Sequence, residues 1–599
     1  MSSAKNVIES NELGTLPRWD LTDLYPSPDS EELKADIEKV RSLSKEFAKA
    51  YEGKLASLSA VDFGTALKEY EGIDELLSKI MSFAGLKHAE KIDDPKIAQF
   101  YQSCQEQITD ISTVLLFFTL ELNKVDQSTL DGFLKNEAVA HYASWIQGVR
   151  DFAAHQLDDE MEKLLHEKRV SGKAAWMRLF DETFAYLRFP YDGKELASQE
   201  LLEKLSDADR SVREKAAKAF ADVLGKNIQL FGLITNTLAK DKATEDKWRN
   251  YESPLAARNL VNQVEDDVVQ ALVTAVKNAY PKLSHRYYAL KAKWMGLDEM
   301  EYWDRNAPLA EEDNSKIKYN DAVDTVLDAY KAFSPEIGEV ATKFFDNDWI
   351  DVPMVPGKSP GAFAHSCVPS VHPYLLLNYQ GRTRDVMTLA HELGHGVHQY
   401  LAAKKQGHLL SDTPLTLAET ASVFGEMLTF QSMLKTTTDP KKRKVMLAKK
   451  VEDMLNTVVR QISFHQFEWE VHTRRQQGEL TADEISEIWL NIAKESLGPI
   501  FNYRDEYKYF WAYIPHFIHS PFYVYAYAFG DCLVNSLYAV YQNSDEGFTE
   551  KYWEMLAAGG SKRHKELLAP FGLDASNPDF WSKGLEMISG FIDELETLE

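Results

Sequence analysis

Residues 389–401 read LAHELGHGVHQYL and contain the pattern HExxH, in which His391 and His395 are four residues apart. Side chains at this spacing lie on the same face of an α-helix, so both imidazoles can reach one metal ion. Glu392 lies beside them and can take a proton from a water activated by that ion, which is the chemistry of a zinc peptidase. The stretch therefore predicts a helix that carries a zinc centre.

A third ligand is required, because a pattern this short also occurs by chance. His398 lies seven residues after His391, about 10 Å along the helix axis, which is too far for both to bind one ion. The longer pattern HExxHxxGxxH fails as well, since His398 and Leu401 occupy the places of its glycine and last histidine. The first glutamate after His395 is Glu419, and we predict that it supplies the third ligand from a second helix. His398 is then a polar residue beside the site.

Three other carboxylates near the pattern have open roles. Glu426 follows Glu419 by seven residues, so on a helix it shares a face with it and could accept a hydrogen bond from a ligand histidine. The alternative is a glutamate facing solvent. Asp385 precedes His391 by six residues and could orient an imidazole or supply a charge at the helix start. Asp412 is a further candidate ligand, should Glu419 not bind the metal.

The residues HELGHGVH at 391–398, followed by AETAS at 418–422, resemble the thimet oligopeptidase superfamily of zinc metallopeptidases, in particular its oligoendopeptidase F branch. The resemblance extends from WDLTDLY at 19–25 to the tyrosine-rich segment near residue 520. It implies one zinc ion, a mainly helical zincin-like fold, and a deep enclosed cleft over the metal. The implied reaction is hydrolysis of internal bonds in short unfolded peptides.

A second stretch whose side chains could take part in catalysis is PHFIHSPFYVYAYAF at residues 515–529. Tyr523 and Tyr527 are four residues apart, so their phenols face the same way if the stretch is helical. A phenol is protonated at neutral pH and can donate a hydrogen bond to the oxyanion that forms when water adds to a peptide carbonyl. Aromatic-rich helices are usually core. The resemblance implies catalytic roles for His516, Tyr523 and Tyr527, and His519 competes with His516 for the role of the histidine.

The pattern along most of the chain predicts amphipathic helices, with apolar residues repeating at steps of three and four. The first such stripe consists of Leu33, Ile37, Val40, Leu43 and Phe47. Prolines and glycines interrupt residues 346–388, where the runs at 362–368 and 374–379 predict two short strands. These strands precede the metal helix and could offer a sheet edge to which an extended peptide adds. The alternative is a small structural hairpin.

A chain of 599 residues exceeds the size of one hydrophobic core, so two or more subdomains are expected. The turn PYDG at residues 190–193 is the clearest boundary signal in the first half of the chain. We place an N-terminal helical domain at 1–195 and a catalytic zinc metallopeptidase domain at 196–599.

The formal net charge of −26 argues against a nucleic acid or an anionic membrane as partner. Three isolated cysteines, Cys104, Cys367 and Cys532, argue against a disulfide framework and fit a reducing cytosol. The apolar run at 114–118 is too short to span a bilayer. We expect a soluble cytoplasmic protein whose partners are short peptides, while its oligomeric state stays open.

The sequence as a whole predicts a zinc-dependent oligoendopeptidase. A related zinc exopeptidase, of dipeptidase or carboxypeptidase type, could carry the same ligands. A non-catalytic helical peptide-binding protein with an accidental HExxH is the alternative from another class.

Overall fold

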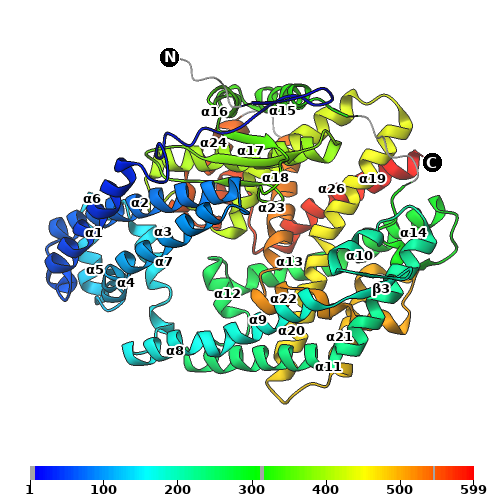
Figure 1. Ribbon diagram of the computed structural model, residues 1–599, viewed down its shortest axis with the longest axis horizontal. Helices are drawn as coiled ribbons and strands as arrows, with labels where there is room; N and C mark the ends of the chain where they lie inside the picture. Colours follow the sequence, from blue (N-terminus) through cyan, green and yellow to red (C-terminus); the bar gives the residue numbers. More distant parts are fainter. Residues whose placement is uncertain (1–6, 310–315, 544–546, 599) are drawn as a thin grey trace. The chain divides into compact units, whose positions relative to one another are not determined.

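The computed structural model describes residues 7–309, 316–543 and 547–598. Helices make up most of these ranges, together with a few short strands in small sheets (Figure 1). The predicted mainly α-helical fold with a small β element beside the HExxH helix is therefore confirmed. None of the helices in these ranges combines the length and the apolar character that crossing a membrane requires.

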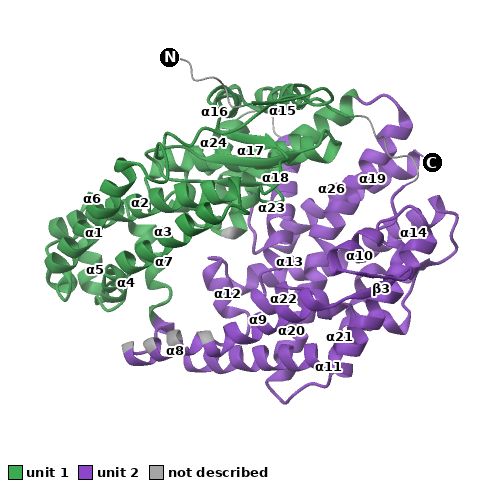
Figure 2. Ribbon diagram, viewed as in Figure 1, with its two compact units in different colours: residues 1–153, 314–436, 543–572 green, residues 154–313, 437–542, 573–599 purple. Residues whose placement is uncertain are grey.

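The chain divides into two compact units, each assembled from three separate stretches (Figure 2). Unit 1 contains residues 1–153, 314–436 and 543–572, and unit 2 contains residues 154–313, 437–542 and 573–599. The chain therefore passes between the units several times. The domains predicted from the sequence, 1–195 and 196–599, are each continuous in the chain, whereas each compact unit combines three stretches. The two-domain division stays a prediction.

Unit 1 combines N-terminal helices with the helices that follow its main sheet. Its helices are α1 (Glu31–Tyr51), α2 (Ala60–Glu90), α3 (Pro95–Thr113), α4 (Leu116–Leu122), α5 (Gln127–Phe133), α6 (Glu137–Ala140), α7 (Ala143–Arg150), α15 (Tyr319–Phe333), α16 (Pro335–Asp346), α17 (Thr383–Gln406), α18 (Leu415–Thr436), α24 (Phe548–Ala557) and α25 (His564–Leu568). The side chain of Ser30 caps α1 by accepting the backbone N–H of Leu33. Of the predicted stripe on α1, Leu33, Ile37, Val40 and Phe47 are buried, whereas Leu43 is only half-buried.

The main sheet of unit 1 has three strands in the order β6, β8, β7. Their bounds are Ile350–Pro353 for β6, Phe363–His365 for β7 and Tyr374–Tyr379 for β8. β7 pairs antiparallel with β8, with Phe363 opposite Leu376 and His365 opposite Tyr374, which confirms the two predicted strands. The sequence analysis missed β6, which pairs parallel to β8. β8 lies in the centre, consistent with its nearly continuous apolar sequence, and β7 is an edge strand packed against α17.

Unit 2 is helical apart from two short pairs of strands. Its helices are α8 (Asp159–Ser171), α9 (Lys173–Tyr186), α10 (Ser198–Lys204), α11 (Arg210–Trp248), α12 (Ala256–Val261), α13 (Asp266–Ala279), α14 (Ser284–Trp294), α19 (Pro440–Thr457), α20 (Val459–Arg475), α21 (Ala482–Leu497), α22 (His516–His519), α23 (Tyr525–Asn543) and α26 (Pro578–Thr597). The strand pairs are β3 (Phe189–Tyr191) with β4 (Lys194–Leu196), and β5 (Met300–Glu301) with β9 (Phe501–Asn502). A further pair, β1 (Val7–Ser10) with β2 (Gly14–Pro17), belongs to unit 1.

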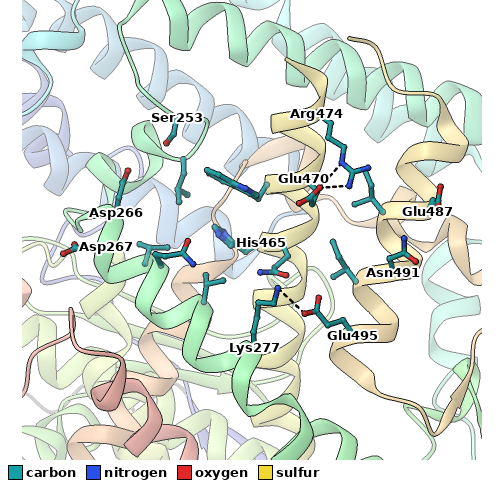
Figure 3. A pocket seen from close by; sticks show the side chains of 18 residues that line it. Ser253, Asp266, Asp267, Lys277, His465, Glu470, Arg474, Glu487, Asn491 and Glu495 are labelled. Atoms are coloured by element: carbon teal, nitrogen blue, oxygen red, sulfur yellow. Dashed lines mark hydrogen bonds and ion pairs between the residues drawn. The ribbon is translucent and has the colours of Figure 1, made fainter. Parts of the chain in front are cut away.

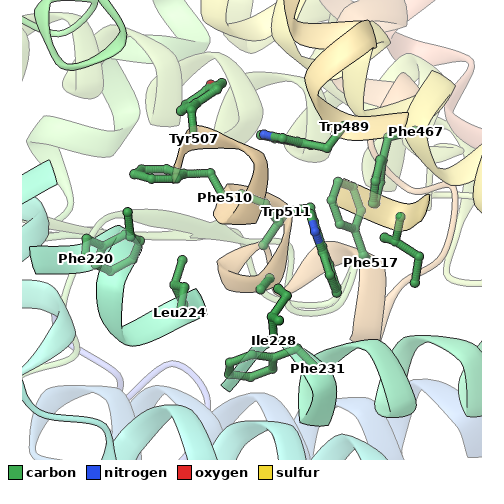
Figure 4. Close-up of a cluster of buried hydrophobic side chains, with 14 of the residues drawn as sticks. Phe220, Leu224, Ile228, Phe231, Phe467, Trp489, Tyr507, Phe510, Trp511 and Phe517 are labelled. Atoms are coloured by element: carbon green, nitrogen blue, oxygen red, sulfur yellow. The ribbon is translucent and has the colours of Figure 1, made fainter. Parts of the chain in front are cut away.

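An aromatic core in unit 2 supports the segment that contains His516 (Figure 4). A stretch of 3₁₀-helix, η5 (Asp505–Tyr513), packs against α11 and α21, and α20 packs against both of these helices. The labelled members of this core are Phe220, Leu224, Ile228, Phe231, Phe467, Trp489, Tyr507, Phe510, Trp511 and Phe517. The indole N–H of Trp511 donates to the hydroxyl of Ser486 at 3.0 Å, so its polar atom is satisfied inside the core. Phe517 belongs to this core and directly follows His516, so the core fixes the backbone at the histidine.

Candidate active site

A close contact between α17 and α18 brings the predicted metal ligands together. Gly394 lies between the two histidines of HExxH, where a Cβ atom would be 2.4 Å from the carbonyl oxygen of Ala421. The same atom would be 2.6 Å from the Cα of Ser422, so only glycine permits this approach of the two backbones. The backbone of α18 can therefore come close enough for Glu419 to reach the histidines.

His391, His395 and Glu419 form the one group that could hold a metal ion among the residues described. The Oε2 atom of Glu419 is 3.4 Å from Nε2 of His391 and 3.4 Å from Nε2 of His395. Neighbouring ligands of a tetrahedral zinc ion with bonds of about 2.1 Å are about 3.4 Å apart. The two nitrogens and the carboxylate oxygen therefore fit a zinc ion in their chemistry and in their spacing.

The pKa values of the two glutamates are shifted in opposite directions. Burial raises the pKa of Glu419, but the hydrogen bond and charge of His395 and the charge of His391 outweigh burial and lower this pKa to about 2. Glu419 is thus a carboxylate at neutral pH, and the hydroxyl of Ser422 donates to its Oε2 at 2.7 Å. Burial raises the pKa of Glu392 above its ordinary value, as suits a general base.

The structure distinguishes between the open roles of the nearby carboxylates. Oε2 of Glu426 lies 3.5 Å from Nδ1 of His391, which is the ring nitrogen that the predicted metal does not use. Glu426 can therefore hold the orientation of this imidazole, and it does not face solvent as the alternative supposed. The Oδ2 atom of Asp385 instead accepts the backbone N–H groups of Gln380 and Arg382, both at 2.9 Å. Asp385 is thus a helix-start residue, and Asp412 is outside the ligand group.

His398 is buried beside the ligands without joining them. Its Nε2 lies 3.3 Å from the hydroxyl of Thr413, and burial lowers its pKa to about 4, so the ring is neutral. His395, His398, Asp412 and Thr413 all line a cavity of about 130 Å³. This arrangement agrees with the prediction of a polar residue beside the site.

Three groups that support the HExxH helix and Glu419 were not predicted from the sequence. The phenol of Tyr330 on α15 donates to the carbonyl oxygen of Ala390 at 2.7 Å, and the backbone N–H of Ala364 on β7 bonds to the carboxylate of Glu392. The third group is the hydroxyl of Ser422. Ser422 lies three residues after Glu419, which is a helical spacing that could have indicated it. No local signal connects Tyr330 to a helix 60 residues away.

The contact at Gly394 leads to a first prediction. We expect Gly394→Ala to push α17 and α18 apart, because the added methyl group would overlap the backbone of Ala421. Overpacking of this kind typically lowers stability by about 1–3 kcal/mol, and here it should also weaken zinc binding. Thermal unfolding and zinc titration measure both effects. Gly478→Ala is the matched control, since a Cβ there meets no neighbouring atom, and equal zinc affinity in both variants would contradict the prediction.

His516, Tyr523 and Tyr527 form a second cluster, which lies in unit 2, whereas the metal ligands lie in unit 1. Nε2 of His516 is 3.4 Å from the phenol oxygen of Tyr527, and the ring centres of Tyr523 and Tyr527 are 5.3 Å apart. His519 is not part of this cluster, because its Nε2 pairs with Asp181 at 2.8 Å. The two tyrosines do not share one helix, since α23 begins at Tyr525 and Tyr523 lies in the preceding turn, so the helical condition on which their common direction was expected is not met.

A larger cavity, of about 860 Å³, lies elsewhere in unit 2, between α13, α20 and α21 (Figure 3). None of the residues predicted to bind metal or to catalyse lines this cavity. Four of its charged groups form two ion pairs, Lys277 with Glu495 at 3.1 Å and Arg474 with Glu470 at 2.8 Å. Cavity volume alone would therefore point to a part of unit 2 that contains none of the predicted site residues.

Comparisons with known proteins agree with the geometry. The family described as Oligopeptidase F matches residues 121–189, and Peptidase family M3 matches residues 204–587. Oligopeptidase PepF of Bacillus subtilis is 27% identical, with 99% of this chain and 89% of the relative covered. A solved structure from Chlamydophila abortus has a TM-score of 0.86 at 25% identity and covers 97% of this chain and 98% of its own.

The fold also matches that of oligoendopeptidase-F from Enterococcus faecium, with a TM-score of 0.71 at 24% identity. That alignment covers 94% of this chain and 98% of the Enterococcus chain. Since Peptidase family M3 matches well over half of the residues, including the HExxH helix and Glu419, this chain belongs to peptidase family M3.

Proposed function

We propose that this protein is a zinc-dependent oligoendopeptidase that hydrolyses internal bonds of short unfolded peptides. The observation that carries the proposal is the position of one Glu419 oxygen, 3.4 Å from Nε2 of both His391 and His395. Membership of a peptidase family supports hydrolysis of peptide bonds as the reaction. The names of its relatives, which include Oligopeptidase PepF and oligoendopeptidase-F, support short peptides as substrates.

In this proposal His391, His395 and Glu419 hold one zinc ion, and Glu426 orients the ring of His391 through Nδ1. When bound, zinc would supply the Lewis acidity that brings the pKa of a water molecule near neutrality. Glu392 removes a proton from the attacking water and delivers it to the amine that leaves. The raised pKa of Glu392 suits both halves of that transfer.

The substrate would bind as an extended strand along the edge strand β7. β7 pairs with β8 on one side only, and the backbone N–H of its residue Ala364 bonds to Glu392. A peptide added to this edge would therefore run beside the general base. The alternative role of β7 and β8 as a purely structural hairpin offers no reason for that contact.

Tyr523, Tyr527 and His516 complete the proposal as hydrogen-bond donors to the oxyanion. Tyr523 and Tyr527 are half-buried, whereas Phe522, Val524, Tyr525 and Ala526 are buried. The two phenols therefore reach the surface of unit 2 while their backbone is held inside. Neutral phenols in this position can stabilise a developing negative charge. The enclosed cleft over the metal remains an implication of the family resemblance.

The setting of the activity belongs to the same proposal. The three cysteines are free, and Cys104 and Cys532 are buried, which suits a cytoplasmic enzyme. The net charge of −26 argues against nucleic acids and anionic membranes as partners. Membership of a peptidase family supports peptides as partners.

Zinc content and peptide cleavage test the proposed function together. We expect about one zinc ion per purified chain and cleavage of an internally quenched fluorescent peptide with both ends blocked. A chelator should abolish cleavage, and added zinc should restore it. A zinc exopeptidase would leave the blocked peptide intact, and a binding protein would hold the peptide without cutting it. Cleavage by metal-free protein would contradict zinc dependence.

A further inference from the structure

The segment that carries Tyr523 has an unusual backbone. Phe522, the residue directly before it, has a φ of +60°, in the left-handed region that bulky residues rarely adopt. Its side chain is completely buried, so the surrounding residues determine this conformation. Because the φ of Phe522 sets the direction of the chain as it enters Tyr523, whatever holds Phe522 also sets where the phenol of Tyr523 points.

Glu468 on α20 holds one end of the peptide unit between Pro521 and Phe522. Its Oε1 atom accepts the backbone N–H of Phe522 at 2.8 Å, and its side chain is 1% exposed. Its Oε2 atom is buried and has no hydrogen-bond partner among the described residues. An apolar side chain would fill this place without leaving an oxygen unsatisfied, so the bond to Phe522 is what the carboxyl group contributes. Burial raises the pKa of Glu468 to about 8.

Arg258 on α12 holds the other end of the same peptide unit. Its Nε donates to the carbonyl oxygen of Pro521 at 3.3 Å, and its guanidinium carbon lies 5.7 Å from the centre of the Tyr523 ring. The N–H and the C=O of one peptide unit thus form hydrogen bonds with two side chains from different helices. This double contact fixes the plane of the peptide, and with it the backbone that leads into Tyr523.

Further contacts secure the segment on both sides of Tyr523. The rings of His465 and His472, one turn away from Glu468 on α20, pack against Phe522 with ring centres 5.8 and 5.1 Å away. After Tyr523, the phenol oxygen of Tyr525 accepts from Nδ2 of Asn262 at 2.8 Å and donates to Oδ1 of Asn259 at 2.7 Å. Tyr523 is therefore the freer residue between two fixed anchor points.

We propose that Glu468 is a positioning residue for Tyr523, which acts with Arg258 by fixing the peptide unit between Pro521 and Phe522. The inference rests on the proposed role of Tyr523 as an oxyanion donor. Glu468 itself does not have to touch the substrate. Its effect should therefore appear in kcat, through the placement of the phenol, and leave substrate and zinc binding unchanged.

Two substitutions of Glu468 separate the hydrogen bond from packing. Glu468→Gln keeps an acceptor oxygen and should keep kcat close to that of the wild type. Glu468→Leu removes the acceptor at similar volume and should lower kcat by up to about 100-fold, as misplacement of a catalytic group by an ångström can do. KM and zinc content should stay unchanged in both variants. Glu470→Leu on the same helix is the control, because Glu470 forms an ion pair with Arg474 at the surface and its loss should leave kcat unchanged.

A double-mutant comparison decides whether Glu468 acts through Tyr523. Tyr523→Phe alone should lower kcat, and adding Glu468→Leu to it should cause no further loss. Losses that multiply would overturn the positioning role, as would a wild-type kcat in Glu468→Leu. A wild-type kcat in Tyr523→Phe would instead refute the proposed catalytic role of Tyr523 itself. The two failures are therefore distinguishable.

Arg258 provides a second route should Glu468→Leu not fold, as judged by circular dichroism and thermal unfolding. Arg258→Met removes the contact with Pro521 while it keeps most of the side-chain length. Arg258→Met should lower kcat, as Glu468→Leu does. In protein that already carries Tyr523→Phe, it should cause no further loss of kcat. An unchanged kcat in folded Arg258→Met protein would overturn the proposal.

Discussion

Glu392→Gln is expected to remove nearly all turnover while zinc stays bound. Glutamine has the same shape as glutamate but cannot take a proton from water, and general acid and base catalysis by one group contributes roughly 100- to 10,000-fold to a rate. The ligands His391, His395 and Glu419 are unchanged in this variant, so the metal content should match that of the wild type. Steady-state cleavage of a quenched peptide and metal analysis of the same preparation measure the two quantities.

Asp385→Asn is the matched control for this experiment, since it makes the same chemical change on the same helix. Asp385 accepts two backbone N–H groups at the start of α17, and an asparagine retains an acceptor oxygen there. Its kcat should stay near the wild-type value. Glu392→Gln protein that still cleaved peptide at the wild-type rate would remove Glu392 from the mechanism.

Glu419→Ala is expected to lose both zinc and activity. Its carboxylate supplies the only oxygen in the ligand group of the described residues, and alanine leaves the two histidines without a third partner. Even groups that only orient a ligand contribute about 10- to 100-fold to metal affinity, so loss of a ligand should weaken zinc binding by more than about 100-fold. Competition with a metal-sensitive dye measures the affinity.

Glu426→Ala provides the graded comparison for Glu419→Ala. It removes the carboxylate at Nδ1 of His391 but leaves all three ligand atoms, so zinc affinity should fall by about 10- to 100-fold. Full zinc occupancy in Glu419→Ala protein would contradict the ligand assignment. The search for the third ligand would then turn to Glu426 or Asp412.

The candidate metal site could be predicted because two of its three residues have a characteristic local spacing. His391, Glu392 and His395 lie within one helical turn, and Glu419 is the next glutamate along the chain. The helix, the two strands at β7 and β8, and the proximity of Glu419 all follow from patterns of a few residues. Gly394 is in the same motif, but its role depends on Ala421 and Ser422, which no spacing rule connects to it.

The tyrosine segment was only partly predictable, because tertiary contacts override its local pattern. The spacing of Tyr523 and Tyr527 places their phenols on one side only if both lie on a helix, and the helix begins at Tyr525. The peptide unit before Phe522 is held by Glu468 and Arg258, which are 54 and 263 residues away from their partners. The choice between His516 and His519 likewise depended on Asp181, far earlier in the chain.

The way the chain passes between its two units limits how the protein can be shortened. A fragment that began at residue 196 would contain α17 and α18, but it would lack the N-terminal helices that complete unit 1. It would also lack α8 and α9, which belong to unit 2. A single cut there would therefore leave both halves of the enzyme with exposed apolar faces. We therefore do not expect a shortened fragment with only the catalytic region to fold alone, and variants are best made in the whole chain.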